Sequence, residues 1–195
     1  MALHRPLPPI DPAKTALVLI DLQRGIVGRE LAPRSGPEVV RTADSVAKAL
    51  KARGGVIVRV HVSYGPDGAA ALKQDVDESA GSPSPGWDEF VDEAKPAEGD
   101  VVITKHQWGA FYGTELDLQL RRRGVNTIIL GGIATNFGVE STARDAWERG
   151  YQLLLVEDIM AASLQQTHAN SVKYIFPRLG RVCLAADVIA AIHGK

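Results

Sequence analysis

Six short aliphatic runs, separated by segments of helical period, constrain this chain more than any other feature of its sequence. The first run, Ala16–Ile20 (ALVLI), is bounded by polar residues and is aliphatic throughout. That pattern is typical of a strand buried on both faces of a sheet. Five further runs repeat the signal and predict five more strands: Val56–Val62, Val101–Thr104, Thr127–Leu130, Leu153–Val156 and Arg181–Leu184.

Helical segments lie between these runs. Glu38–Arg53 places its apolar residues on one stripe and is followed by two glycines, which end a helix readily. Four further helices are expected over Thr114–Arg123, Asn136–Arg149 with Asn136 as its cap, Leu164–Phe176 ending at Pro177, and Asp187–Ile192. Strands that alternate with helices predict one α/β domain over residues 1–195, a three-layer α/β/α fold around a mainly parallel, six-stranded, Rossmann-like sheet.

One long stretch fits neither pattern. Tyr64–Gly99 is rich in glycine and proline, and some helix is expected only within Trp87–Glu93. Long irregular segments of compact domains are usually functional or contact another subunit. We therefore expect this stretch to contribute to a site or to an oligomer contact.

The composition excludes several classes of partner. Lys and Arg total 22 and Asp and Glu total 23, so the net charge of −1 gives no reason to expect nucleic acid or an anionic membrane. No window approaches the roughly 18 apolar residues of a membrane span. The single cysteine, Cys183, excludes an intrachain disulfide, and the N-terminal segment lacks the apolar stretch of a signal peptide. A cytoplasmic protein is expected.

Polar residues follow the predicted strands at the edge where open parallel sheets bind ligands. Asp21 follows the first strand, His61 lies near the end of the second, and Lys105 follows the third. The loop 131–136 (GGIATN) follows the fourth strand, and the pair Glu157-Asp158 follows the fifth. The sequence thus predicts a site at this edge.

Asp21 and Lys105 are the most informative of these residues. Either one alone has an ordinary interpretation, Asp21 as a carboxylate that braces a loop and Lys105 as a solvated lysine. Together, a carboxylate and an ammonium at neighbouring strand ends can share a proton and set each other's pKa. We predict that this pair is the chemical centre of the site.

No cofactor or metal is expected at this centre. The loop before Asn136 offers backbone N–H groups to an oxyanion, but it lacks the spacing of a dinucleotide-binding motif. The five histidines show no metal-ligand spacing. Trp108, Phe111 and Tyr112 fit a pocket wall as well as they fit a core or a subunit interface.

Three other residue groups have a structural interpretation. Cys183 lies within an apolar run, which favours a buried thiol over a nucleophile. Glu157-Asp158 is interpreted as a carboxylate pair at a helix start, and His168 as a surface residue of a helix.

Three sequence blocks together resemble a known family. They are ALVLIDLQ, TKHQWGAFYGTELDLQLRRRGVNTIILGGIATN and GVESTARDAWERGY, and the resemblance runs from about Thr15 to the C-terminal helix. The chain is similar to the isochorismatase-like hydrolases, the superfamily that includes nicotinamidases and N-carbamoylsarcosine amidases. The resemblance implies a hydrolase of small molecules that assembles as a dimer or a larger homo-oligomer.

The resemblance also assigns roles to residues. In the amidase branch a triad of Asp, Lys and Cys acts on an amide carbonyl, and Asp21 and Lys105 match its first two members. The position of the nucleophile is occupied by Gly138, and the metal-binding Asp-x-His of nicotinamidases is absent. The Ile133–Ala134 bond matches a cis peptide that shapes the oxyanion pocket. The substrate contacts implied are Gln23, His61, Trp108, Phe111, Asn136 and Phe137.

Glycine at position 138 decides between mechanisms, because an acyl-enzyme requires a nucleophilic side chain. The resemblance therefore implies direct attack by water, assisted by Asp21 and Lys105. The isochorismatases proper also have glycine here, which makes a vinyl ether such as isochorismate a candidate substrate. The alternative is a catalytically silent small-molecule-binding protein that kept the pocket of an amidase and lost its nucleophile.

Overall fold

A computed structural model describes residues 7–65, 75 and 84–194 of the chain. Its sheet has the order β3-β2-β1-β4-β5-β6, and every pair of neighbouring strands is parallel. The strands are β1 (Thr15–Ile20), β2 (Val56–Val62), β3 (Val101–Lys105), β4 (Thr127–Ile133), β5 (Gln152–Ala161) and β6 (Arg181–Cys183). The predicted parallel α/β sheet is confirmed.

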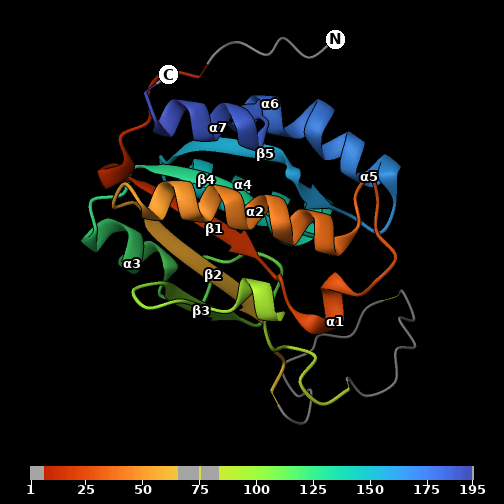
Figure 1. Cartoon of the computed structure of the whole chain (residues 1–195). Helices are drawn as coiled ribbons and strands as arrows, with labels where there is room; N and C mark the ends of the chain where they lie inside the picture. The colour runs from red at the N-terminus through yellow and green to blue at the C-terminus, as the bar shows by residue number, and fades with distance from the viewer. Residues whose placement is uncertain (1–6, 66–74, 76–83, 195) are drawn as a thin grey trace.

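Helices cover both faces of the sheet (Figure 1). One face packs against α2 (Gly36–Lys51) and α7 (Ala185–Ile192), and the other packs against α3 (Leu116–Arg122), α4 (Glu140–Glu148) and α6 (Phe176–Leu179). The shorter elements are α1 (Arg24–Val27), α5 (Gln165–Asn170), the 3₁₀ turns η1 (Pro12–Lys14) and η2 (Asp92–Ala94), and the π-turns η3 (Thr135–Val139) and η4 (Ser171–Ile175). No helix in the described part of the chain is long and apolar enough to cross a membrane.

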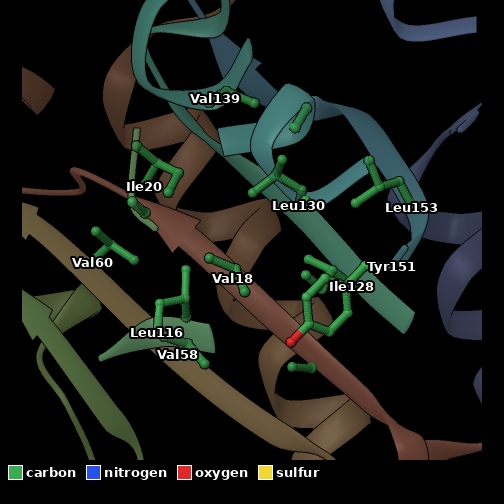
Figure 2. Packing of buried hydrophobic residues seen from close by; sticks show 14 of the residues in the cluster. Val18, Ile20, Val58, Val60, Leu116, Ile128, Leu130, Val139, Tyr151 and Leu153 are labelled. Atoms are coloured by element: carbon green, nitrogen blue, oxygen red, sulfur yellow. The ribbon is translucent and has the colours of Figure 1, made fainter. Parts of the chain in front are cut away.

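Strand alternation divides the core into two clusters. In β1, Leu17 and Leu19 point toward α2 and α7, whereas Val18 and Ile20 point toward α3 and α4. Figure 2 shows the second cluster, in which side chains of β1, β2 and β4 converge with Leu116 of α3. Because both faces of β1 and β4 are dry, these strands carry aliphatic residues in nearly unbroken runs, which is why the sequence identified them. The edge strand β3 instead alternates buried and exposed residues.

The fifth strand is longer than predicted. It continues past Val156 to Ala161, and its register with β4 shifts between Leu130 and Gly132. Glu157 and Asp158 therefore lie in a bulged strand and not at the start of a helix, so that prediction was wrong. Asp158 nevertheless accepts a hydrogen bond of 2.7 Å from the N–H of Ala185, at the start of α7. Bulges of this kind redirect side chains and leave no clear trace in hydrophobic periodicity.

Two helix predictions also need correction. Asn136 does not cap a helix, because Ala134 has the extended cap conformation and Asn136 lies inside η3. The segment predicted as one helix to Phe176 is divided into α5, η4 and α6, and Pro177 stands in the first turn of α6. Proline is tolerated there because the first helical N–H groups have no partner inside the helix. Of Trp87–Glu93, only the end enters a helical turn, η2, and much of Tyr64–Gly99 lies outside the described residues.

Candidate active site

The site begins with an unusual backbone conformation at Asp21. By strict alternation Asp21 would point toward α2, like Leu17 and Leu19 before it. Its φ of 55° breaks the alternation, and Asp is among the residues that accept such a conformation most readily. The Asp21 side chain consequently turns to the opposite face of the sheet, where it meets Lys105. Val101 and Ile103, which precede Lys105 in β3 at alternate positions, point to the same face.

Asp21 and Lys105 form a buried ion pair. Asp21 Oδ2 lies 2.8 Å from Lys105 Nζ, and the two side chains are 6% and 2% exposed. The sequence had suggested that the strand ends carrying Asp21 and Lys105 are neighbours, but β2 lies between β1 and β3. The long side chain of Lys105 spans that distance. The ammonium also donates to the carbonyl oxygen of Gln107 at 3.0 Å. Asp21 Oδ1 is buried and makes no hydrogen bond with any described residue.

Burial determines the protonation of the pair. Desolvation raises the pKa of Asp21 from its ordinary value of 3.8 to about 6, although the Lys105 ammonium lowers it by its charge and its hydrogen bond. A nearly neutral pKa lets one carboxyl group release and take up a proton near physiological pH. Asp21 can therefore act as an acid or as a base.

Position 138 faces this pair. A Cβ added to Gly138 would lie 3.3 Å from Asp21 Oδ2, 3.4 Å from the Trp108 carbonyl oxygen and 2.8 Å from Cγ2 of Ile20. A longer side chain at this position would thus enter the site. Cys183 lies on β6, which β4 and β5 separate from β1, and burial raises the pKa of its thiol to about 12.

The backbone before Gly138 follows β4 closely. Gly132 has a φ of 126°, and a Cβ there would lie 2.1 Å from the carbonyl oxygen of Ile20, so only glycine allows this approach of β4 to β1. The next peptide bond, Ile133–Ala134, is cis. The carbonyl of Ala134 then accepts hydrogen bonds from the N–H groups of Phe137 and Val139, which leads the chain directly into η3.

The residues expected to contact substrate do not all lie at the pair. Gln23 is fully buried, and its amide bonds with both the N–H and the carbonyl of Val62, which attaches the end of β1 to β2. Phe111 is 4% exposed and packs in the core against Tyr151. His61 bonds with the carbonyl of Asp88 and lines a separate hollow of about 380 Å³.

Of the other three expected contacts, Asn136 and Phe137 lie in η3 and Trp108 packs against Phe137. Trp108 and Phe137 are 49% and 42% exposed, and their ring centroids lie 4.7 Å apart. Asn136 lines an open hollow of about 450 Å³ together with Glu140 and Tyr174. In the described part of the chain no group of three His, Cys, Asp or Glu residues is placed to hold a metal ion.

Sequence reasoning missed two residues that support η3. His168, expected on the surface, is 3% exposed, and its Nδ1 lies 2.8 Å from the Thr135 hydroxyl. Thr142 is 1% exposed and bonds with Gly138. A buried threonine on a helix has an ordinary apolar methyl group, so no sequence signal separates Thr142 from the core.

Comparison with known proteins shows the family of this chain. An isochorismatase domain matches residues 15–187. The chain belongs to the isochorismatase family. It is 45% identical to the uncharacterized isochorismatase family protein YecD of Escherichia coli O157:H7 over 184 residues, 91% of this chain and 96% of that protein. It is 48% identical to the corresponding protein YwoC of Bacillus subtilis, over 88% of this chain and 90% of that protein.

A solved structure shows the same fold. The isochorismatase family protein of Burkholderia thailandensis superimposes with a TM-score of 0.90 and 48% identity, over 96% of this chain and 99% of that chain. A more distant relative has an activity in its name: the ureidoacrylate amidohydrolase RutB of Methylorubrum extorquens is 31% identical, over 76% of this chain and 70% of that protein. The family is one of hydrolases that act on small molecules.

Proposed function

We propose that this member of the isochorismatase family hydrolyses a small metabolite through Asp21 and Lys105, by direct attack of water. The observation that carries the proposal is the buried ion pair of 2.8 Å facing Gly138. The site has an acid or base and a cation but no side chain at the nucleophile's position. Water is then the nucleophile that remains for a hydrolysis.

A vinyl ether such as isochorismate is the first substrate to test. In this reaction protonated Asp21 gives its proton to the terminal carbon of the enol ether, and water adds to the cation that results. The adduct loses a proton to Asp21 and collapses to pyruvate and an alcohol. A pKa of about 6 keeps a useful fraction of Asp21 protonated near neutral pH, which supports this order of steps.

A C–N bond is the second class to test, since a relative 31% identical is named an amidohydrolase. Here ionised Asp21 would take a proton from the attacking water, and the cis Ile133–Ala134 segment with the N–H of Gly138 would face the oxyanion. The two classes need opposite protonation states of Asp21. The rate on a vinyl ether falls as the pH rises through about 6, whereas the rate on an amide rises.

A catalytically silent binding protein is the alternative function. The observation that favours it is the burial of the pair, with both side chains almost inaccessible and nothing but a backbone at position 138. It predicts that a small acid or amide raises the melting temperature while no product forms.

The experiment measures pyruvate from isochorismate and ammonia from ureido and amide compounds, with the wild-type chain, Asp21→Asn and Lys105→Met. Asp100→Asn is the matched control, because Asp100 is also a buried carboxylate paired with cations, Arg59 and Lys51, but lies outside the site. Turnover that Asp21→Asn abolishes and Asp100→Asn keeps supports the hydrolase. Ligand-induced stabilisation without any product supports the silent protein instead.

The proposed enzyme needs no metal and works in the cytoplasm as a dimer or larger homo-oligomer. Activity unchanged by a chelator and a mass of at least two chains in light scattering are the expected results.

A further inference from the structure

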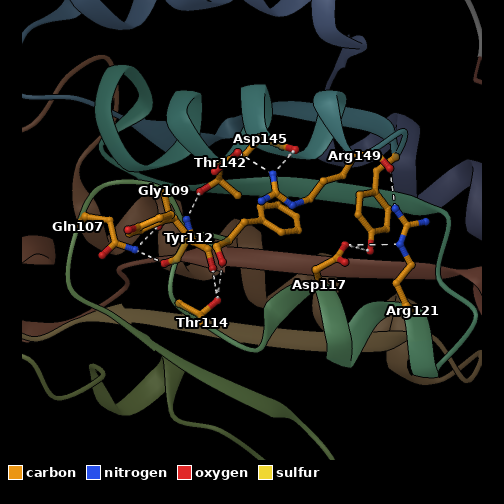
Figure 3. Close-up of polar contacts among 12 residues, drawn as sticks. Gln107, Gly109, Tyr112, Thr114, Asp117, Arg121, Thr142, Asp145 and Arg149 are labelled. Carbon is orange, nitrogen blue, oxygen red and sulfur yellow. Dashed lines mark hydrogen bonds and ion pairs between the residues drawn. The ribbon is translucent and has the colours of Figure 1, made fainter.

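One buried hydroxyl connects the two segments that form the site. Thr142, in the first turn of α4, donates from Oγ1 to the carbonyl of Gly138 at 2.7 Å. The same oxygen accepts from the N–H of Ala110 at 3.1 Å. Ala110 belongs to the loop that follows Lys105, and Figure 3 shows Thr142 above this loop, which also carries Gln107 and Thr114.

The first of these bonds alone would be ordinary, because a helical threonine often bonds with the carbonyl four residues before it. The second bond makes the difference, since it ties α4 to a loop 32 residues away in sequence. A hydroxyl group that both donates and accepts is required, and Thr142 is 1% exposed, so water does not replace either bond.

The loop held in this way contributes to the surroundings of the ion pair. The Lys105 ammonium donates to the Gln107 carbonyl, and the Gln107 side chain in turn donates to the carbonyls of Gly109 and Tyr112. The carbonyl of Trp108 lies 3.4 Å from where a Cβ on Gly138 would stand. The separation of loop and η3 thus sets the space around Gly138, Asp21 and Lys105.

We propose that Thr142 is a positioning residue, whose hydroxyl fixes the η3 turn that carries Gly138 against the loop that orients Lys105. The inference rests on the proposed function only in taking Asp21 and Lys105 as the reacting groups. Without the hydroxyl, the Gly138 carbonyl and the Ala110 N–H lose the partner that they share, and both segments shift to find new ones.

A thiol introduced at position 138 reports this geometry without any substrate. In Gly138→Cys, the absorbance of the thiolate in the far ultraviolet gives the thiol pKa, and the wild-type chain corrects for Cys183. A displacement of about 1 Å relative to the Lys105 ammonium changes that pKa by about half a unit, at an effective dielectric constant of about 20. The titration is repeated with Thr142→Ser, Thr142→Val and Thr142→Ala added.

The matched control is Thr114→Val. Thr114 donates to the carbonyl of Ala110 at 2.6 Å and accepts from the N–H of Leu116 at 3.1 Å, so it bridges the same loop residue to α3 and not to η3. Its loss weakens the loop by a comparable set of bonds. A general loss of stability therefore affects Thr114→Val and Thr142→Val alike.

The expected result is that Thr142→Ser leaves the titration of the introduced thiol unchanged, that Thr142→Val and Thr142→Ala move it by about half a pH unit or more, and that Thr114→Val does not move it. Titrations that coincide in all folded variants overturn the proposal, and so does an equal shift in Thr114→Val. A shift specific to Thr142 in a chain that hydrolyses nothing refutes the proposed function and leaves the positioning role in place. On an active chain, Thr142→Val lowers kcat more than it changes KM, and Thr142→Ser restores it.

Discussion

The raised pKa of Asp21 makes the stability of the fold depend on pH in a direction opposite to that of most carboxylates. The pKa is about 6 in the folded chain and 3.8 ordinarily, so the folded chain binds this proton more tightly than the unfolded chain does. The stability that Asp21 contributes is fully present below about pH 4 and is lost as the pH rises to about 6. The difference of pKa corresponds to about 3 kcal/mol, and Asp21 is only 4% exposed, so solvent screens little of it.

Urea denaturation at pH values from about 4 to 8, followed by far-ultraviolet circular dichroism, measures this dependence. The free energy of unfolding of wild type minus that of Asp21→Asn should fall by about 2.5 kcal/mol across the window, because the subtraction removes the other titrating groups and part of the effect already lies below pH 4. A difference that stays flat or rises with pH would refute the burial argument.

The control has the opposite sign. Burial alone would raise the pKa of Asp100, but hydrogen bonds from Lys51, the Ala97 N–H and Arg59 outweigh it and lower the pKa. Its contribution is therefore present above its ordinary pKa of 3.8 and is lost only as the pH falls below that value. Asp100→Asn should leave the profile between about pH 5 and 8 nearly unchanged, within an uncertainty of about 0.5 kcal/mol.

Three further predictions test the burial of other residues. Cys183, buried and with its thiol pKa raised to about 12, should react with a disulfide reagent only in denaturant, and fast labelling of the native chain would contradict this placement. Phe111→Ala should cost about 3–5 kcal/mol in denaturation experiments, whereas Trp108→Ala should cost less than about 1 kcal/mol; equal costs would show that both rings are core. Thr135→Val should destabilise the fold by about 1–3 kcal/mol, because it removes the hydroxyl beside Nδ1 of buried His168, while Thr135→Ser should be close to wild type.

The sequence predicted the sheet and the central pair because both follow from a simple pattern. Aliphatic runs buried on both faces give the strands, and parallel strands bring the residues after them to one edge. Asp21 and Lys105 meet there even though β2 separates their strands. What the pattern could not give was the conformation that directs Asp21 to the face of Lys105, since a φ of 55° at a single Asp leaves no periodic signal.

The expectations about the surrounding residues were weaker because aromatic and amide side chains serve cores and pockets equally well. Phe111 and Trp108 lie three positions apart in one loop, yet the first is buried and the second is half exposed. Gln23 was predicted to contact substrate, and in the structure its amide completes the backbone hydrogen bonding of Val62. Such assignments depend on loop geometry, and hydrophobic periodicity carries no information about it.

The net charge of the Asp21–Lys105 pair depends on the protonation of Asp21, and a charged ligand changes that protonation. With Asp21 ionised the pair is neutral, and with Asp21 protonated it carries the single positive charge of Lys105. An amidase-type thiolate would offset that charge, but Gly138 supplies none. A bound anion near the ammonium would offset it instead, and by repelling the Asp21 carboxylate it would raise the pKa of Asp21 further above 6. For the proposed vinyl-ether hydrolysis, a substrate with a carboxylate would therefore both balance the buried charge and keep Asp21 protonated.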